Sequence, residues 1–461
     1  MSISSSTTLI VHDFVREIVI CLTDSAKKVT SELEDEIQWK RGSDGHFRGK
    51  KNHVPSLGLE FNDEWLSSRT GYQQCVECIK SDAVVGPHLD VLVGTWTSAS
   101  RVTANTILRW LTYSMFDEQG RLTFVGERFH AEWHQLVTFF GANQVISKMV
   151  SPLPGLVVPA FPLRLNDELV LDRFTDKEVT RFNQVGLIRP LFHRLSFIDS
   201  GVAVGIRKTF ASPKVIQRNG ESNAVVAIDG TGQFGRRPES RDDLAVEDVL
   251  SALRLFKPTR VRALGTLSFI DAPWLSAGTS FQILGQWPNG GNYNLSESEV
   301  TPFLDLWKLL EKESMRFEFS IRRFNLAFDR RLQDDRLIDL IIAAEALFLS
   351  DTGAKDRGEL RFRFSLRAAK FIEHPTYDEL GIYQLMRNAY DARSAIVHGG
   401  TPTVTKLPDD DSATLSTFID AIEEIVRLGI RKAIAMDDGG KKLRQSNFWD
   451  SLVLQTPSIN R

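Results

Sequence analysis

The chain has 461 residues, which is enough for two or three domains. Its hydrophobic content of 42% and its charged content of 25% are typical of a soluble globular protein. The formal net charge is -3, so the chain as a whole offers no electrostatic case for nucleic-acid binding, and an RNA site would have to be a local basic patch.

Several features of the sequence predict a cytoplasmic protein that does not enter a membrane. The longest apolar run, Leu337–Leu349, is interrupted by Asp339 and Glu345 and is too short to span a bilayer. The first residues carry no basic segment, and Asp13 interrupts the apolar stretch that follows, so no signal peptide is expected. The chain has three cysteines, which predicts a reducing compartment and no disulfide framework.

Residues 1–154 are predicted to be rich in helix. Residues 8–38 follow a helical pattern, with a broad apolar face that leads into a charged segment. Residues 40–56 are rich in Lys, Arg, Gly, Ser and His, and we interpret them as a solvated linker, with contact to phosphates as the alternative. Residues 98–118 and 128–140 carry aromatic residues at helical spacing, which favours a buried aromatic core over a platform for nucleobases.

Cys75 and Cys78 form an isolated C-x-x-C pair. A zinc site needs four ligands, and the chain has no second pair, although His88 and Cys21 are candidates to complete one. We therefore interpret the pair as two ordinary thiols. No metal site and no cofactor are expected.

Residues 155–291 are predicted to mix strands and helices. Prolines mark a soft boundary near residue 154, and short β-branched or alternating runs follow, separated by glycine and asparagine turns. Helices are predicted at 176–185, where Thr175 begins a capping box, and at 246–255. The prediction leaves open whether this region forms one unit with residues 1–154.

Residues 230–235 match the dinucleotide-binding pattern G-x-G-x-x-G. A nucleotide site requires a helix to begin there, so that its N-terminus holds the pyrophosphate. The next residues, 236–240, are typical of a loop, and the region has no regular alternation of strands and helices. We therefore favour a flexible loop.

Residues 292–461 are predicted to form an all-helical bundle. Ser296 and Glu299 form a capping-box pattern. Apolar residues then recur at helical spacing in five segments with short connections: 297–313, 316–349, 357–373, 379–398 and 411–436. The predicted fold class is thus α+β multidomain, with an N-terminal mixed α/β region and a C-terminal helical bundle.

The end of the predicted helix 379–398 holds the most informative stretch of the chain. Arg393 and His398 lie in its last turns, Gly399 stands where a left-handed cap is expected, and Pro402 blocks continuation. An arginine followed four to six residues later by a histidine recurs elsewhere, for example at Arg128 and His134, and carries no weight alone. An amphipathic helix with a sharp glycine stop distinguishes this copy. A fixed cation beside a titratable ring suits phosphate binding and proton transfer.

Residues 294–435 resemble the C-terminal HEPN domain of the ApeA-like kind. The resemblance rests on three stretches in order, 335–348, 366–369 and 390–399. It implies a helical bundle that usually dimerises and often cleaves RNA without a metal. One departure is Ser394, which follows the motif arginine where catalytic members often carry Asn, His or Asp.

The resemblance implies that Arg393 stabilises a phosphate and that His398 acts as acid or base. Glu345 resembles a recurrent acid of the family. Six residues are predicted to bind RNA or to orient the catalytic pair: Asn388, Asp391, Ser394, Arg363, Arg367 and Glu345. The alternative for Arg393 is a salt bridge to Asp391 or Glu345, and for His398 a hydrogen bond at the helix end.

The expected function is that of a metal-independent endoribonuclease effector of the HEPN type, in antiviral defence or toxin-like growth arrest. Its expected partners are RNA, a second copy of the chain bound through the C-terminal bundle, and an unknown trigger or protein at a sensing N-terminal region. The alternative is a non-catalytic HEPN module that binds RNA or only dimerises.

Overall fold

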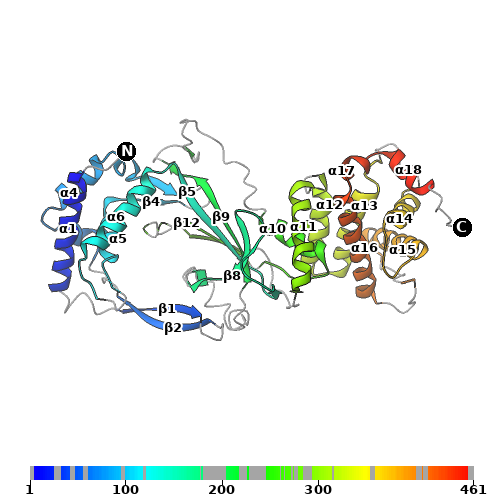
Figure 1. The fold of residues 1–461 in the computed structure, drawn as a ribbon, viewed down its shortest axis with the longest axis horizontal. Helices are drawn as coiled ribbons and strands as arrows, with labels where there is room; N and C mark the ends of the chain where they lie inside the picture. Colours follow the sequence, from blue (N-terminus) through cyan, green and yellow to red (C-terminus); the bar gives the residue numbers. More distant parts are fainter. Residues whose placement is uncertain are drawn as a thin grey trace. The chain divides into compact units, whose positions relative to one another are not determined.

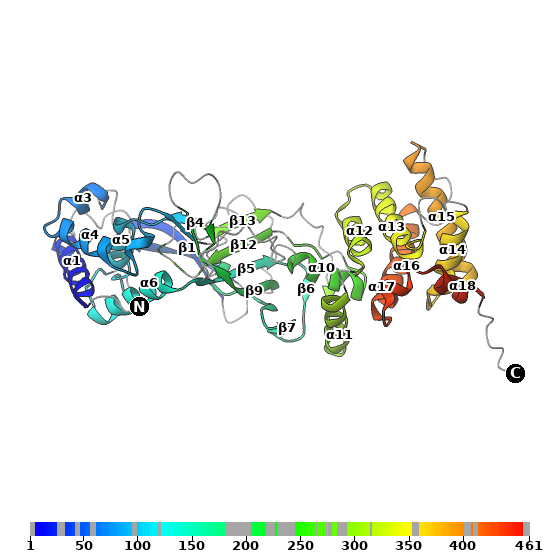
Figure 2. The same ribbon diagram turned by 90° about the horizontal axis from the view of Figure 1, so that it is seen from above.

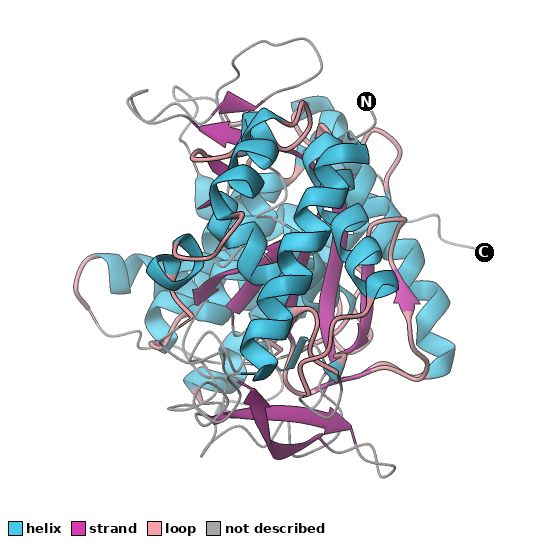
Figure 3. Ribbon diagram, turned by 90° about the vertical axis from the view of Figure 1, so that its left-hand side faces the viewer, coloured by secondary structure: helices cyan, strands magenta, loops and turns pink. Residues whose placement is uncertain are grey.

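The computed structural model of the chain divides into two compact units, and each is described by itself (Figure 1). The first unit comprises Met1–Pro154, Phe161–Leu244 and Ala263–Leu284, and the second comprises Gly155–Ala160, Ala245–Arg262 and Gly285–Arg461. Segments within the predicted region 155–291 thus contribute to both units. Figure 3 shows helices in cyan and strands in magenta, and this mixture confirms the predicted α+β fold class.

The structural statements below refer to the residues that the structure describes. These are 5–24, 33–41, 47–55, 61–94, 99–117, 121–176, 178–179, 204–217, 226–227, 245–259, 261–263, 265–270, 272, 274, 279–283, 293–313, 316–352, 359–400, 407–408 and 414–454.

Helices in the first unit gather around one apolar core. They are α1 (Ser5–Asp24), α3 (Asp63–Ser67), α4 (Tyr72–Ser81), the 3-10 helix η1 (Gly86–His88), α5 (Ala104–Tyr113) and α6 (Gly126–Gly141). Figures 1 and 2 both show α4, α5 and α6 beside α1. Phe129, Trp133 and Phe140 of α6 are buried in this core, which confirms the predicted aromatic core for residues 128–140, whereas Tyr113 of the other predicted segment is 40% exposed.

Strands of the first unit form three sheets within the described ranges. Their bounds are β1 (Leu33–Arg41), β2 (Phe47–Pro55), β3 (Leu92–Gly94), β4 (Ala99–Arg101), β5 (Gln144–Pro152), β7 (Leu163–Arg164), β8 (Leu169–Arg173), β9 (Val204–Pro213), β10 (Val215–Gln217), β11 (Val226–Ala227), β12 (Gly265–Ile270) and β13 (Thr279–Ile283). The largest sheet has the order β13-β12-β5-β9-β8-β7 and is antiparallel throughout. A second sheet has the order β11-β10-β3-β4, and β1 pairs with β2 alone.

Two predictions for the N-terminal part are wrong. The helix predicted over 8–38 ends at Asp24, and residues 33–41 form β1 instead. Residues 47–55 of the predicted linker form β2. The two strands pair over nine residues each, from Leu33 opposite Pro55 to Arg41 opposite Phe47. Cross-strand pairing stabilises a strand through neighbours that are distant in sequence, so it can override a local helical pattern.

His88 and Lys214 are buried ionisable residues of the first unit. The imidazole Nδ1 lies 2.9 Å from the carbonyl oxygen of Val84, and the His88 ring packs on Phe140. The Lys214 ammonium donates to the carbonyls of Phe139 and Phe140, at the C-terminal end of α6. Burial lowers the pKa of His88 to about 4, with a further contribution from the charge of Lys214. Burial lowers the pKa of Lys214 to about 8.

This histidine is expected to make the first unit sensitive to acid. Between pH 6.5 and about 4 the unfolded chain binds a proton at His88 that the folded chain does not. Burying His88 in its neutral form therefore costs no stability above pH 6.5. The free energy of unfolding then decreases as the pH falls from 6.5 toward 4. Melting temperatures of the wild type and of His88→Asn, measured from pH 7.5 to pH 4.5, test this. The difference between wild type and variant should shrink toward acid pH, and parallel curves would contradict the assignment.

The second unit is predominantly helical. Its elements are β6 (Leu156–Val157), α10 (Ala245–Phe256), β14 (Tyr293–Asn294), α11 (Glu297–Glu313), α12 (Glu318–Asp329), α13 (Gln333–Phe348), α14 (Leu360–Phe371), α15 (Glu379–Val397), α16 (Leu415–Ala435), α17 (Gly439–Lys442) and α18 (Ser446–Leu454). Helix α13 packs against α12, α14, α15 and α16. The predicted helix 316–349 is interrupted, because Arg330 and Leu332 adopt extended backbone conformations between α12 and α13.

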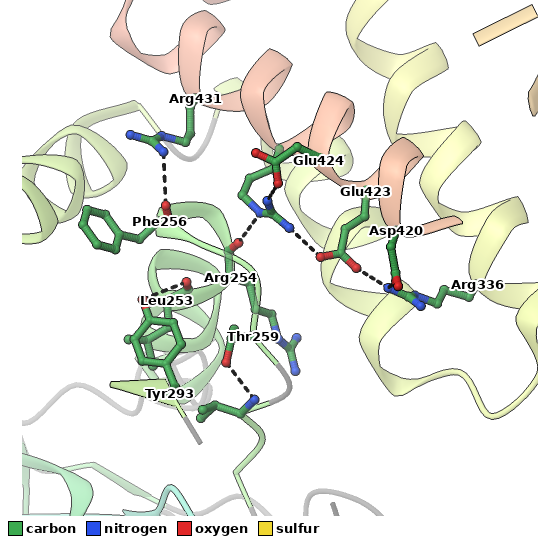
Figure 4. A network of polar contacts seen from close by, with 12 residues as sticks. Leu253, Arg254, Phe256, Thr259, Tyr293, Arg336, Asp420, Glu423, Glu424 and Arg431 are labelled. Carbon is green, nitrogen blue, oxygen red and sulfur yellow. Dashed lines mark hydrogen bonds and ion pairs between the residues drawn. The ribbon is translucent and has the colours of Figure 1, made fainter. Parts of the chain in front are cut away.

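Polar contacts join the end of α10 to α16 (Figure 4). The last carbonyls of an α-helix have no partner within the helix. Here Arg427 Nε donates to the carbonyl of Arg254 at 3.0 Å, and Arg431 donates to the carbonyl of Phe256 at 3.1 Å. Two arginines of α16 therefore cap the C-terminal end of α10. Arg427 also binds Glu423 at 2.5 Å, and Glu423 accepts a hydrogen bond from Arg336 of α13.

No helix in the described part of the chain combines the length and the apolar composition needed to cross a membrane.

Candidate functional site at the end of helix α15

Helix α15 begins and ends with defined caps. The carboxylate of Asp378 accepts a hydrogen bond from the backbone N–H of Gly381 at 2.7 Å, which satisfies a free donor of the first turn. At the other end Gly399 has a φ of 76° and donates to the carbonyl of Ile396, and Gly400 donates to that of Ala395. This is the Schellman arrangement, which needs a residue that tolerates positive φ. The predicted glycine stop is confirmed.

His398 occupies the C-cap position of α15. Its backbone N–H donates to the carbonyl of Ser394 at 3.2 Å, so the helix end fixes the position of its backbone. The residue is exposed. The imidazole is thus accessible to a ligand from solvent. Because the Schellman turn fixes the chain on both sides, the ring is attached to a defined point of the fold.

Arg393 and Glu345 meet between α15 and α13. The guanidinium Nη2 lies 3.9 Å from the carboxylate Oε2, at the outer limit for an ion pair. Both side chains are largely buried, with 29% of Arg393 and 24% of Glu345 exposed. Among the described residues, the buried Nε of Arg393 has no hydrogen-bond partner. The guanidinium is therefore held near Glu345 while part of its donor capacity is unused.

Burial dominates the electrostatics around this pair. It raises the pKa of Glu345 above its usual range, and the charge of Arg393 opposes the shift. Burial likewise raises the pKa of Tyr390, with a contribution from Glu345. The free-energy cost of desolvating a carboxylate is offset by the hydrogen bonds that it accepts or by a nearby positive charge. Here Arg393 supplies that charge at 3.9 Å.

The other predicted residues lie on α15 and α14 in different surroundings. Asp391 is half exposed and receives two hydrogen bonds of 2.8 Å from Arg361, so the ion pair expected for Asp391 forms with Arg361 rather than with Arg393. Asn388 and Ser394 are partly buried on α15. Arg361 is not among the residues predicted for the site, because the i, i+4 rule cannot reveal a pair between two helices.

Arg367 is a buried residue of the helical unit. Its guanidinium donates to both carboxylate oxygens of Asp351 at 2.6 Å and 2.9 Å and to the carbonyl of Phe348, and it stacks over Trp449. Arg363 also approaches Asp351, at 3.6 Å. Of the two arginines of α14 that were predicted to bind RNA, Arg363 is thus partly exposed and Arg367 is buried. We leave Arg367 out of the site.

The C-x-x-C pair lies within helix α4. Cys75 is buried, and burial together with the neighbouring Cys78 raises the pKa of its thiol to about 12. A raised pKa disfavours the thiolate, which is the reactive form and the form that binds metals. In the described ranges no three His, Cys, Asp or Glu residues come together as metal ligands. The G-x-G-x-x-G stretch at 230–235 lies outside the described residues.

Comparisons with known proteins found no match: no family model, no curated protein and no solved structure is similar to the chain.

Proposed function

We propose that the chain is a metal-independent endoribonuclease of the HEPN type, with its site at the end of α15. The observation that carries this proposal is the state of Arg393, a partly exposed cation 3.9 Å from Glu345 whose Nε is unpaired among the described residues. Such a guanidinium can donate to a phosphate oxygen without first breaking a strong ion pair. His398 stands on the same helix, and five residues correspond to a rise of about 7.5 Å.

The reaction assigns a separate role to each residue. A base takes the proton of the ribose 2′-hydroxyl, whose oxygen attacks the phosphorus, and an acid protonates the leaving 5′-oxygen. The products carry a 2′,3′-cyclic phosphate and a 5′-hydroxyl. His398 is the acid or base, Arg393 stabilises the charge on the phosphate, and Glu345 positions Arg393. Ser394, Asn388 and Asp391 are available to orient the substrate.

One chain supplies a single His398, whereas the reaction needs both an acid and a base. We therefore propose a homodimer in which two α15 ends face each other, since a twofold axis doubles every group at the interface. The first unit then senses a trigger or a protein partner. Such a ribonuclease would act in antiviral defence or toxin-like growth arrest.

The test is cleavage of end-labelled RNA by the purified protein in EDTA. Wild type is expected to leave 2′,3′-cyclic phosphate ends. His398→Ala and Arg393→Ala are expected to lower the rate by at least ~100-fold, the usual contribution of a general acid or base or of a stabilising cation. Arg387→Ala is the matched control, because Arg387 is an exposed arginine on the same helix and should be dispensable.

Three outcomes would overturn the proposal. Cleavage undiminished in both variants would place the chemistry elsewhere. An equal loss of cleavage rate in Arg387→Ala would indicate a general effect of positive charge on the helix. An inactive wild type that still forms dimers and binds RNA would support the alternative, a non-catalytic module. Growth arrest on expression that depends on His398 gives an independent readout in cells.

A further inference from the structure

Strands β1 and β2 form a ribbon whose charges are divided between its two halves. Toward the connecting loop, cations occupy Lys40, Arg41, Arg48, Lys50 and Lys51, and residues 37–41 and 47–51 contain no acid. Toward the open end, the acids Glu34, Asp35 and Glu36 lie opposite Val54, His53 and Asn52. The register thus concentrates five positive charges in one half of the ribbon, in a chain whose net charge is -3.

Pairing is what concentrates this charge. Lys40 lies directly opposite Arg48, and Gln38 lies opposite Lys50. Alternate residues along a strand are about 6.6 Å apart, and neighbouring strands about 4.8 Å. The five basic residues therefore occupy register positions within a short length of ribbon, whereas a solvated linker would spread them over a variable distance.

The ribbon stands apart from the other sheets. Among the described strands, neither β1 nor β2 pairs with a third strand. At about 3.3 Å per residue, nine-residue strands give a length of ~30 Å. A two-stranded ribbon of this kind fits a nucleic-acid groove or can follow a single strand.

We propose that the basic half of the β1–β2 ribbon binds the phosphodiester backbone of a nucleic acid. The clustered cations supply an attraction that the chain as a whole lacks, and binding to phosphates requires no particular base sequence. This site lies in the first unit and is independent of the cleavage proposed at α15. Lysines on the outer edges of a two-stranded ribbon can also serve only to prevent edge-to-edge association, and the experiment separates this role from nucleic-acid binding.

The experiment measures the dissociation constant of labelled 20-nucleotide RNA and DNA at several KCl concentrations in EDTA. All proteins in this experiment carry His398→Ala, so that binding is measured without cleavage. The result therefore tests binding by the ribbon independently of the reaction proposed at α15. The test variant is Lys40→Gln/Arg48→Gln/Lys50→Gln. Each lost phosphate contact lowers the slope of log K against log salt by about 0.7 for single strands and about 0.9 for duplex DNA. The slope should therefore fall by about 2 to 3.

A matched control neutralises the other half of the same ribbon, in Glu34→Gln/Asp35→Asn/Glu36→Gln. It should leave the slope unchanged. A charge-preserving variant, Lys40→Arg/Lys50→Arg, should bind as the parent does even if glutamine disturbs the ribbon. Separate single-stranded and duplex arms identify which nucleic acid is preferred. An equal slope in parent and test variant, or no binding by the parent to any arm, would overturn the proposal.

Discussion

Replacing Glu423 with alanine is expected to destabilise the helical unit by about 3–5 kcal/mol, the usual cost of removing one partner from a buried ion pair. Glu423 lies between Arg427, at 2.5 Å, and Arg336, and its side chain is only 7% exposed. The two arginine side chains are 2% and 8% exposed. Without the carboxylate, two buried guanidinium groups would lose the anion that they share.

Neighbouring groups compensate for this loss only in part, because the carboxylate that Arg427 keeps, that of Glu424, is 33% exposed. Arg254 is buried in the same network, and burial lowers its pKa to about 10, so the charged form is already disfavoured there. Arg336 retains Asp420 at 2.9 Å, but that carboxylate is half exposed. The arginine cap on α10 depends on Arg427, so disorder at α16 should also reach α10.

The measurement is denaturant unfolding combined with hydrogen exchange of α10, α13 and α16. Glu424→Ala is the matched control, because its carboxylate is 33% exposed and Arg427 keeps Glu423. A partly exposed pair of this kind is usually worth less than about 1 kcal/mol. If the two variants lost stability equally, Glu423 would not be the centre of the network.

Local rules in the sequence anticipated the helical unit well. The glycine stop at Gly399 and the capping box of Ser296 and Glu299 depend on residues within a few positions of each other. The glycine stop forms as expected, and half of the capping box forms, because Glu299 accepts from the backbone N–H of Ser296 while its own N–H donates to the carbonyl of Ser296 rather than to its hydroxyl. Non-local features were missed. The β1–β2 ribbon requires pairing with a strand beyond a turn, and Arg427 reaches Arg254, which lies 173 positions away. Periodicity within one window carries no information on either.

The candidate site shows the same division. The sequence correctly predicted that Arg393 lies near a helix end, and it predicted Glu345 or Asp391 as a possible partner. In the structure Arg393 lies near Glu345, and Asp391 pairs with Arg361. No pattern could reveal that Arg361 holds Asp391 or that Arg367 is buried. Arginines at helical spacing look alike in a sequence, and only packing separates a solvated cation from a structural one.

Arg367→Ala is expected to reduce stability by about 3–5 kcal/mol, because it would leave Asp351 buried without its main cation. The side chains of Arg367 and Asp351 are 6% and 2% exposed. Burial alone would raise the pKa of Asp351, but the hydrogen bonds and charge of Arg367 more than offset this and lower it. The substitution would also remove the stacking of the guanidinium on Trp449.

The pH dependence of that loss identifies its cause. In the wild type, Asp351 has a lowered pKa, so its stabilisation is present above pH 3.8 and is lost as the pH falls through its folded-state pKa. In the variant, the buried carboxylate has a raised pKa, and protonation relieves its penalty on acidification. The difference in free energy of unfolding between the wild type and Arg367→Ala should therefore decrease as the pH falls toward 3.8. Arg361→Ala, which removes a half-exposed cation of the same helix, should cost much less stability than Arg367→Ala. If instead Arg367→Ala left stability unchanged and weakened RNA binding, the arginine would be a ligand contact, in agreement with the role predicted from the sequence.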